Sequence, residues 1–82
     1  MVTVDFNPLF EKILGKIKNP ILKKKVKNQI RKIVSNPLVG KPMMHGRKGT
    51  REVYIPPFRL SYVFFEQEDK IVFMHFYHKD EQ

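Results

Sequence analysis

The stretch GTREVYIPPFRLSYVFF, Gly49 to Phe65, decides which fold this chain can adopt. It predicts two strands, Thr50–Ile55 and Phe58–Phe65, because β-branched and aromatic residues dominate both runs. Pro56-Pro57 predicts a turn between them, since proline has no N–H to donate to a strand ladder. An antiparallel hairpin therefore forms the centre of the predicted fold.

Two helices are predicted before this hairpin. Asn7-Pro8 and Asn19-Pro20 each combine a favourable N-cap residue with a proline at the first helical position. After Pro8, apolar residues recur at helical spacing as far as Ile17, and a second helix should span about Pro20–Ser35. The short segment between the two predicts a helical hairpin.

The rest of the chain supplies a loop, a polar turn and two more strands. Val2–Phe6 alternates apolar and polar residues, Leu38–Lys48 is rich in turn formers, and Ile71–Tyr77 is a last strand after the turn Glu66–Asp69. The order β-α-α-β-β-β predicts an α+β fold. We expect a single domain over residues 1–82, with the helical hairpin packed on a mainly antiparallel four-stranded sheet.

The charge balance indicates the class of partner. Sixteen Lys and Arg residues against eight Asp and Glu give a net charge of +8. Such a field favours nucleic acid, an acidic protein or an anionic membrane surface, although many basic proteins are simply soluble. The chain has no cysteine and its N-terminus does not resemble a secretory signal, so a cytoplasmic location is the simplest expectation. No apolar run approaches the roughly 20 residues that span a bilayer, so we predict no membrane insertion.

Several kinds of active site lack the residues they need. No pair of carboxylates stands out as it would in a glycosidase or an aspartic dyad, and there is no Walker-type glycine-rich loop. His75 and His78 are three residues apart, which directs them to opposite faces of a strand and argues against zinc. We therefore predict neither a metal nor a cofactor.

Basic residues near the central hairpin are the more promising group. Arg51 and Arg59 lie on adjacent strands, and further cations enter from the preceding loop and leave after the last strand. The expected cluster is Arg47, Lys48, Arg51, Arg59, His78 and Lys79. Such a cluster could hold one phosphate and stabilise its transition state without a metal. In the alternative, the arginines are solvated strand-end residues paired with Glu52 or Glu66.

Two further features have a structural and a functional interpretation. Tyr54 either packs on the sheet or faces the open side with Glu52 and stacks on a base. The second helix carries cations that form a solvated face or follow a phosphate backbone. These cations are Lys23, Lys24, Lys25, Lys27 and Arg31.

The chain as a whole resembles the RelE/ParE superfamily of toxin–antitoxin toxins, and within it the RelE branch of ribosome-dependent mRNA endonucleases. The stretches that carry the resemblance are VDFNPLFEK, IRKIVSNPLVGKPM, GTREVYI, FRLSYVF and IVFMHFYHKDE, which cover nearly the whole chain in this order. The resemblance implies a fold like that of small microbial ribonucleases. It also implies an acidic RelB-type antitoxin that folds on binding, and action on mRNA in the ribosomal A site.

Arg59 and His78-Lys79 match functional cations of the family, whereas Glu52 and Tyr54 occupy positions where active relatives often carry Lys or Arg. The expected reaction is metal-free attack of the mRNA 2′-hydroxyl on its own phosphate. Arg59, Arg51 and Lys79 would stabilise the phosphorane, His78 would act as acid or base, and Tyr54 would orient a base. Two alternatives remain: a ParE-type poison of DNA gyrase, and an RNA-binding relative without nuclease activity.

Overall fold

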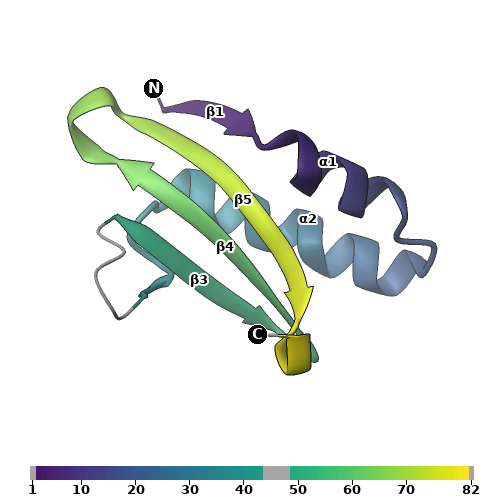
Figure 1. Cartoon of the computed structure of the whole chain (residues 1–82). Helices are drawn as coiled ribbons and strands as arrows, with labels where there is room; N and C mark the ends of the chain where they lie inside the picture. The colour runs from purple at the N-terminus through teal and green to yellow at the C-terminus, as the bar shows by residue number, and fades with distance from the viewer. Residues whose placement is uncertain (1, 44–48, 82) are drawn as a thin grey trace.

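A five-stranded mixed sheet, with two helices packed on one face, makes up the computed structural model, which describes residues 2–43 and 49–81 (Figure 1). The strands occur in the order β1-β5-β4-β3-β2. Their bounds are β1 Thr3–Phe6, β2 Lys41–Pro42, β3 Thr50–Ile55, β4 Phe58–Phe65 and β5 Lys70–His78. The helices are α1 Pro8–Gly15 and α2 Pro20–Ser35, with the 3₁₀ turns η1 Glu66–Glu68 and η2 Lys79–Glu81.

The predicted α+β architecture is confirmed, with one strand more than expected. The additional strand is β2, two residues from the predicted loop, which pairs antiparallel with Glu52 and Arg51 of β3. Pro42 is tolerated there because β2 is an edge strand and needs no second ladder. The β2–β3, β3–β4 and β4–β5 pairings are antiparallel and β1–β5 is parallel, so the sheet is mainly antiparallel, as predicted.

The two helices begin where the Asn-Pro pairs predict. The Asn7 side chain accepts a hydrogen bond from the Leu9 backbone N–H, and Asn19 accepts from those of Ile21 and Leu22. The helix α2 spans the predicted residues, whereas α1 ends at Gly15, before the apolar spacing does. Glycine weakens the last turn of α1, and the second Asn-Pro pair requires extended backbone shortly afterwards.

The core lies between the helices and the sheet. Phe10 of α1 packs against Phe73 of β5 with ring centroids 5.7 Å apart, and Phe6 packs on the same ring at 5.3 Å. The fully buried side chains are Phe10, Val26, Ile33, Ile55, Leu60, Tyr62, Ile71 and Phe73. Burial of each large apolar side chain contributes about 1.5–3 kcal/mol. Neither α1 nor α2 covers the opposite face of the sheet, which is therefore available to a ligand (Figure 1).

Candidate functional site

The two faces of the sheet carry different side chains, and the hairpin register determines which. Tyr54 pairs with Arg59, which pairs in turn with Tyr77, so these three project from one face. Glu52 lies two residues from Tyr54 on β3 and projects from that face too. We call this side, which lies opposite the helices, the open face.

Glu52 lies between a guanidinium and a phenol on the open face. Arg59 Nη1 donates to Glu52 Oε1 over 3.1 Å, and the Tyr77 hydroxyl donates to Oε2 over 3.2 Å. The pairing of Arg59 with Glu52, one of the two partners that the sequence suggested, is therefore observed. The two contacts come from β4 and β5, so both oxygens of the β3 carboxylate are held in place.

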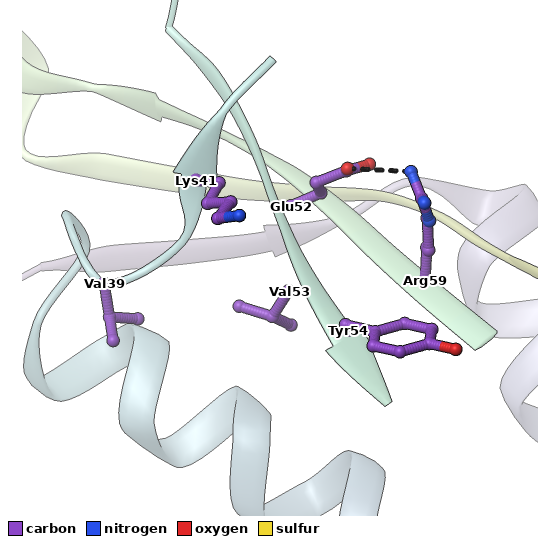
Figure 2. A pocket seen from close by; sticks show the side chains of 6 residues that line it. All are labelled: Val39, Lys41, Glu52, Val53, Tyr54 and Arg59. Carbon is purple, nitrogen blue, oxygen red and sulfur yellow. Dashed lines mark hydrogen bonds and ion pairs between the residues drawn. The ribbon is translucent and has the colours of Figure 1, made fainter. Parts of the chain in front are cut away.

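A pocket of about 370 Å³ opens beside this ion pair, along the part of β3 that β2 does not cover (Figure 2). Tyr54, half exposed, provides an aromatic wall. The lining residues are Val39, Lys41, Glu52, Val53, Tyr54 and Arg59. Two cations, one carboxylate and one aromatic ring give this pocket the groups needed to hold a phosphate and a base.

Arg59 is only partly engaged by Glu52. The Arg59 and Glu52 side chains are 32% and 21% exposed, so solvent and a ligand reach both. Arg59 Nε is buried and has no hydrogen-bond partner in the structure. The partly exposed, planar guanidinium of Arg59 suits the binding of a phosphate.

Arg51 does not join this site, contrary to the predicted cluster. It pairs with Tyr62 across the hairpin and lies on the side of β3 that faces the helices. Its Nη1 donates to the carbonyl oxygens of Gly40, over 2.7 Å, and Leu38, over 3.2 Å. Arg51 therefore holds the segment between α2 and β2.

The buried Tyr62 also binds the segment between α2 and β2. Its hydroxyl donates to the Pro37 carbonyl over 2.8 Å and accepts from the Gly40 N–H over 2.9 Å. Burial raises the pKa of Tyr62, although the Gly40 hydrogen bond and the charge of Arg51 oppose that shift. We call Tyr62 and Arg51, with the carbonyls and N–H that they bind, the loop latch; it fixes Val39 where that residue lines the pocket.

His78 also lies apart from Arg59. Its ring meets the Phe58 ring edge-on at 5.5 Å, and its Nδ1 accepts from the Asp80 N–H. Phe58 and His78 line a separate groove at the end of the helical hairpin. The expectation that His78 lies beside Arg59 is therefore wrong, because neighbouring residues on a strand project to opposite faces. Lys79 is exposed, and its N–H binds the Pro57 carbonyl at the hairpin turn.

The remaining predicted cations are on α2 or outside the described residues. Lys23, Lys24, Lys25, Lys27 and Arg31 are all exposed on α2. Arg47 and Lys48 lie in the segment 44–48, which the structure does not describe. The sequence analysis did not identify Lys41 or Tyr77 as site residues. No signal marked Lys41, which lies in a two-residue strand, and Tyr77 becomes evident only from the β4–β5 register.

The described residues contain neither a group of metal-binding side chains nor a membrane-spanning helix. Within residues 2–43 and 49–81, no three histidine or acidic side chains gather as a metal site would require. None of the helices in that part of the chain has the length and apolar character needed to cross a bilayer.

Comparisons with known proteins place this chain in a family. Residues 4–82 match the model of the ParE toxin of the type II toxin–antitoxin system parDE. The RelBE2 toxin–antitoxin complex of Mycobacterium tuberculosis contains a chain of similar fold, with 26% identity and a TM-score of 0.77 over 95% of this chain and 98% of that one.

Two Escherichia coli structures share the fold at lower identity. A chain of the intact RelBE complex has 12% identity and a TM-score of 0.81, over 95% of this chain and 96% of that one. YafQ has 16% identity and a TM-score of 0.74, over 99% of this chain and 97% of that one. No curated protein matched the sequence. On the family match, this chain belongs to the ParE toxin family within the RelE/ParE superfamily, and it is the toxin of a type II toxin–antitoxin system.

Proposed function

We propose that this toxin is an endoribonuclease that cleaves mRNA in the ribosomal A site, with Arg59 as its phosphate-binding residue. The observation that carries the proposal is the pocket along β3, where Arg59 lies beside the exposed Tyr54 ring. A cation beside an aromatic ring is the pair of groups that single-stranded RNA requires. The resemblance to the RelE branch implies the same substrate.

The reaction is in-line attack of the 2′-hydroxyl on the adjacent phosphate, with departure of the 5′-oxygen. Arg59 binds two non-bridging oxygens and stabilises the charge that the phosphorane gains. Tyr54 stacks on a neighbouring base and orients the sugar. Lys41 supplies a second positive charge from β2, and Lys79 a third from the turn after β5. No step in this scheme requires a metal ion.

The exposed cations of α2 bind ribosomal RNA in this proposal. They lie on the solvent side of the helix and have no acidic neighbour on α2, which contains no Asp or Glu. Each phosphate contact that they make adds about 0.7–0.9 to the slope of log affinity against log salt.

The partner that controls the toxin is an acidic antitoxin of the RelB type, in a heteromeric cytoplasmic complex. The toxin's charge of +8 would accelerate encounter with an acidic chain. The edge of β3 beyond β2 and the exposed Leu38 and Val39 offer backbone and apolar surface to a segment that orders on contact. The toxin–antitoxin complexes among similar structures support such a partner.

One observation favours a second function. The matching family model is named for the ParE toxin of parDE, and ParE-type toxins are the gyrase-poisoning branch implied by the resemblance. A gyrase poison needs a surface that docks on DNA gyrase. It does not need a phosphate-binding site. In that case Arg59 and Glu52 would be an ordinary ion pair on the sheet.

Parallel assays on one preparation distinguish these functions. We expect mRNA in programmed ribosomes to be cut, DNA supercoiling by gyrase to be unaffected, and Arg59→Ala to lose cleavage. Lys12→Ala, which removes one exposed charge from α1, is the matched control and should cut normally. Inhibition of gyrase without RNA cleavage would replace this proposal with the second function, and ribosome binding without either activity would indicate a non-catalytic relative.

A further inference from the structure

We infer that Glu52 is the general base that takes the proton from the attacking 2′-hydroxyl. The inference rests on the proposed ribonuclease function and adds to it the group that activates the nucleophile. A base must reach the 2′-hydroxyl while the phosphate is bound at Arg59. Glu52 meets that condition because it lines the same pocket and its carboxylate contacts Arg59 directly.

The carboxylate is fixed in position before substrate arrives. Arg59 holds Oε1 from β4 and Tyr77 holds Oε2 from β5, so the orientation of Glu52 depends on two strands besides its own. Each oxygen of a carboxylate has two lone-pair sites, and each of these two contacts uses one. A lone pair on either oxygen therefore remains to accept the proton of a sugar hydroxyl.

Other titratable groups of the described residues are less well placed. His78 lies on the helix side, against Phe58. His75 is on the open face, but Ser61 of β4 separates it from Glu52, so the two backbones lie two strand spacings apart, roughly 10 Å. Glu52 is the one carboxylate or imidazole that lines the pocket, among the residues that the structure describes.

Charged and titratable groups surround Glu52 in and beside the pocket. Arg59 on β4 and Lys41 on β2 are the cations that line the pocket, Tyr77 donates from β5, and His75 is the further titratable group of that strand on this face. A phosphate bound at Arg59 shares the guanidinium with Glu52, so the carboxylate lies next to the bound phosphate.

The reaction balances with groups that are present. The 2′-hydroxyl proton moves to Glu52 as the 2′-oxygen bonds to phosphorus. The bond from phosphorus to the 5′-oxygen then breaks, and that oxygen takes a proton from solvent water, which reaches the partly exposed pocket. The products are a 2′,3′-cyclic phosphate and a 5′-hydroxyl end, and Glu52 returns its proton to solvent.

Glu52→Gln tests the inference because it is isosteric, and it removes the negative charge together with the ability to take a proton. The amide oxygen can still accept from Arg59, and the amide nitrogen can donate to the Tyr77 hydroxyl. In single-turnover cleavage on programmed ribosomes, we expect the rate to fall about 10²–10⁴-fold with ribosome affinity unchanged. His75→Gln, which changes the further titratable group of β5 on the open face, should cut at the wild-type rate. Glu52→Asp should lose less than Glu52→Gln, because it keeps a carboxylate.

The controls separate failure of this inference from failure of the proposed function. Glu11→Gln removes one exposed negative charge from α1 and should cut at the wild-type rate. If the wild type cuts and Glu52→Gln cuts equally well, or faster with tighter RNA binding, Glu52 is only a counter-ion of Arg59 and the inference is overturned. If the wild type does not cut RNA at all, the proposed function is wrong and the role of Glu52 with it.

Discussion

Tyr62→Phe should destabilise this protein measurably although it removes a single oxygen atom. The Tyr62 side chain is 0% exposed, and its hydroxyl makes two hydrogen bonds in the loop latch, to the Pro37 carbonyl and from the Gly40 N–H. Each such bond contributes about 0.5–1.5 kcal/mol net. The sum is about 1–3 kcal/mol, because the aromatic packing of the ring is unchanged.

The assay for this prediction is thermal unfolding followed by circular dichroism. For a domain of this size, a loss of about 2 kcal/mol should lower the melting temperature by about 8–16 °C. Tyr54→Phe is the matched control, since that tyrosine is half exposed and should change stability by less than about 0.5 kcal/mol. Equal stabilities of the two variants would show that the latch does not hold the segment before β2, and the placement of Val39 in the pocket would lose its support.

Four further predictions concern the loop latch, Arg59 and the lysines of α2. Because burial raises the pKa of Tyr62, its contribution to stability is present below about pH 10 and lost as pH rises further; the difference between wild type and Tyr62→Phe in unfolding free energy should therefore narrow in alkali. Gly40→Ala should destabilise the fold, since an added Cβ would lie 2.6 Å from the Tyr62 hydroxyl, and calorimetry would detect it. Arg59→Ala should lose RNA cleavage yet cost only about 0.2–1 kcal/mol of unfolding free energy, because its ion pair is partly exposed; unfolding would instead mark Arg59 as structural. Glutamine at the four α2 lysines should lower the salt slope of ribosome binding by roughly 0.7–0.9 per lost contact, and an unchanged slope would make them a solvated face. The four are Lys23, Lys24, Lys25 and Lys27.

The local elements of this fold are predictable because their signals are local. Asn7-Pro8 and Asn19-Pro20 set the starts of both helices by caps that involve only the next three residues. The turn at Pro56-Pro57 likewise placed β3 and β4 correctly. In contrast, β2 pairs through two residues alone, and nothing in Lys41-Pro42 distinguishes a strand from a loop.

Part of the candidate site could be predicted from strand parity, and part could not. A two-residue turn pairs Ile55 with Phe58, and counting back from that pair places Tyr54 opposite Arg59. The same count places Arg51, three residues from Tyr54, on the other face, so the separation of the two arginines was accessible from the sequence. The position of His78 could not be predicted from the sequence, because the register between β4 and β5 shifts at Ser61/Tyr62. No residue pattern marks that irregularity.

The inhibition mechanism of the antitoxin can be tested by what it leaves accessible. If the antitoxin covers the pocket along β3, an anionic dye or a short RNA should lose binding in the complex. If bulk alone keeps the complex out of the A site, small anions should bind the complex and the free toxin equally. We expect bulk together with displacement of the segment after His78. Full ribosomal cleavage at saturating antitoxin would contradict both routes.

The most direct test of the account is to map mRNA ends on programmed ribosomes with a single 2′-deoxy nucleotide at the cleavage site. We predict that wild-type toxin cuts the all-ribose message, leaves a 2′,3′-cyclic phosphate, and fails on the 2′-deoxy message. A chelator selective for transition metals, which leaves magnesium for the ribosome, should have no effect. Cleavage of the 2′-deoxy message, or cleavage that the chelator abolishes, would contradict 2′-hydroxyl attack at the Arg59 pocket.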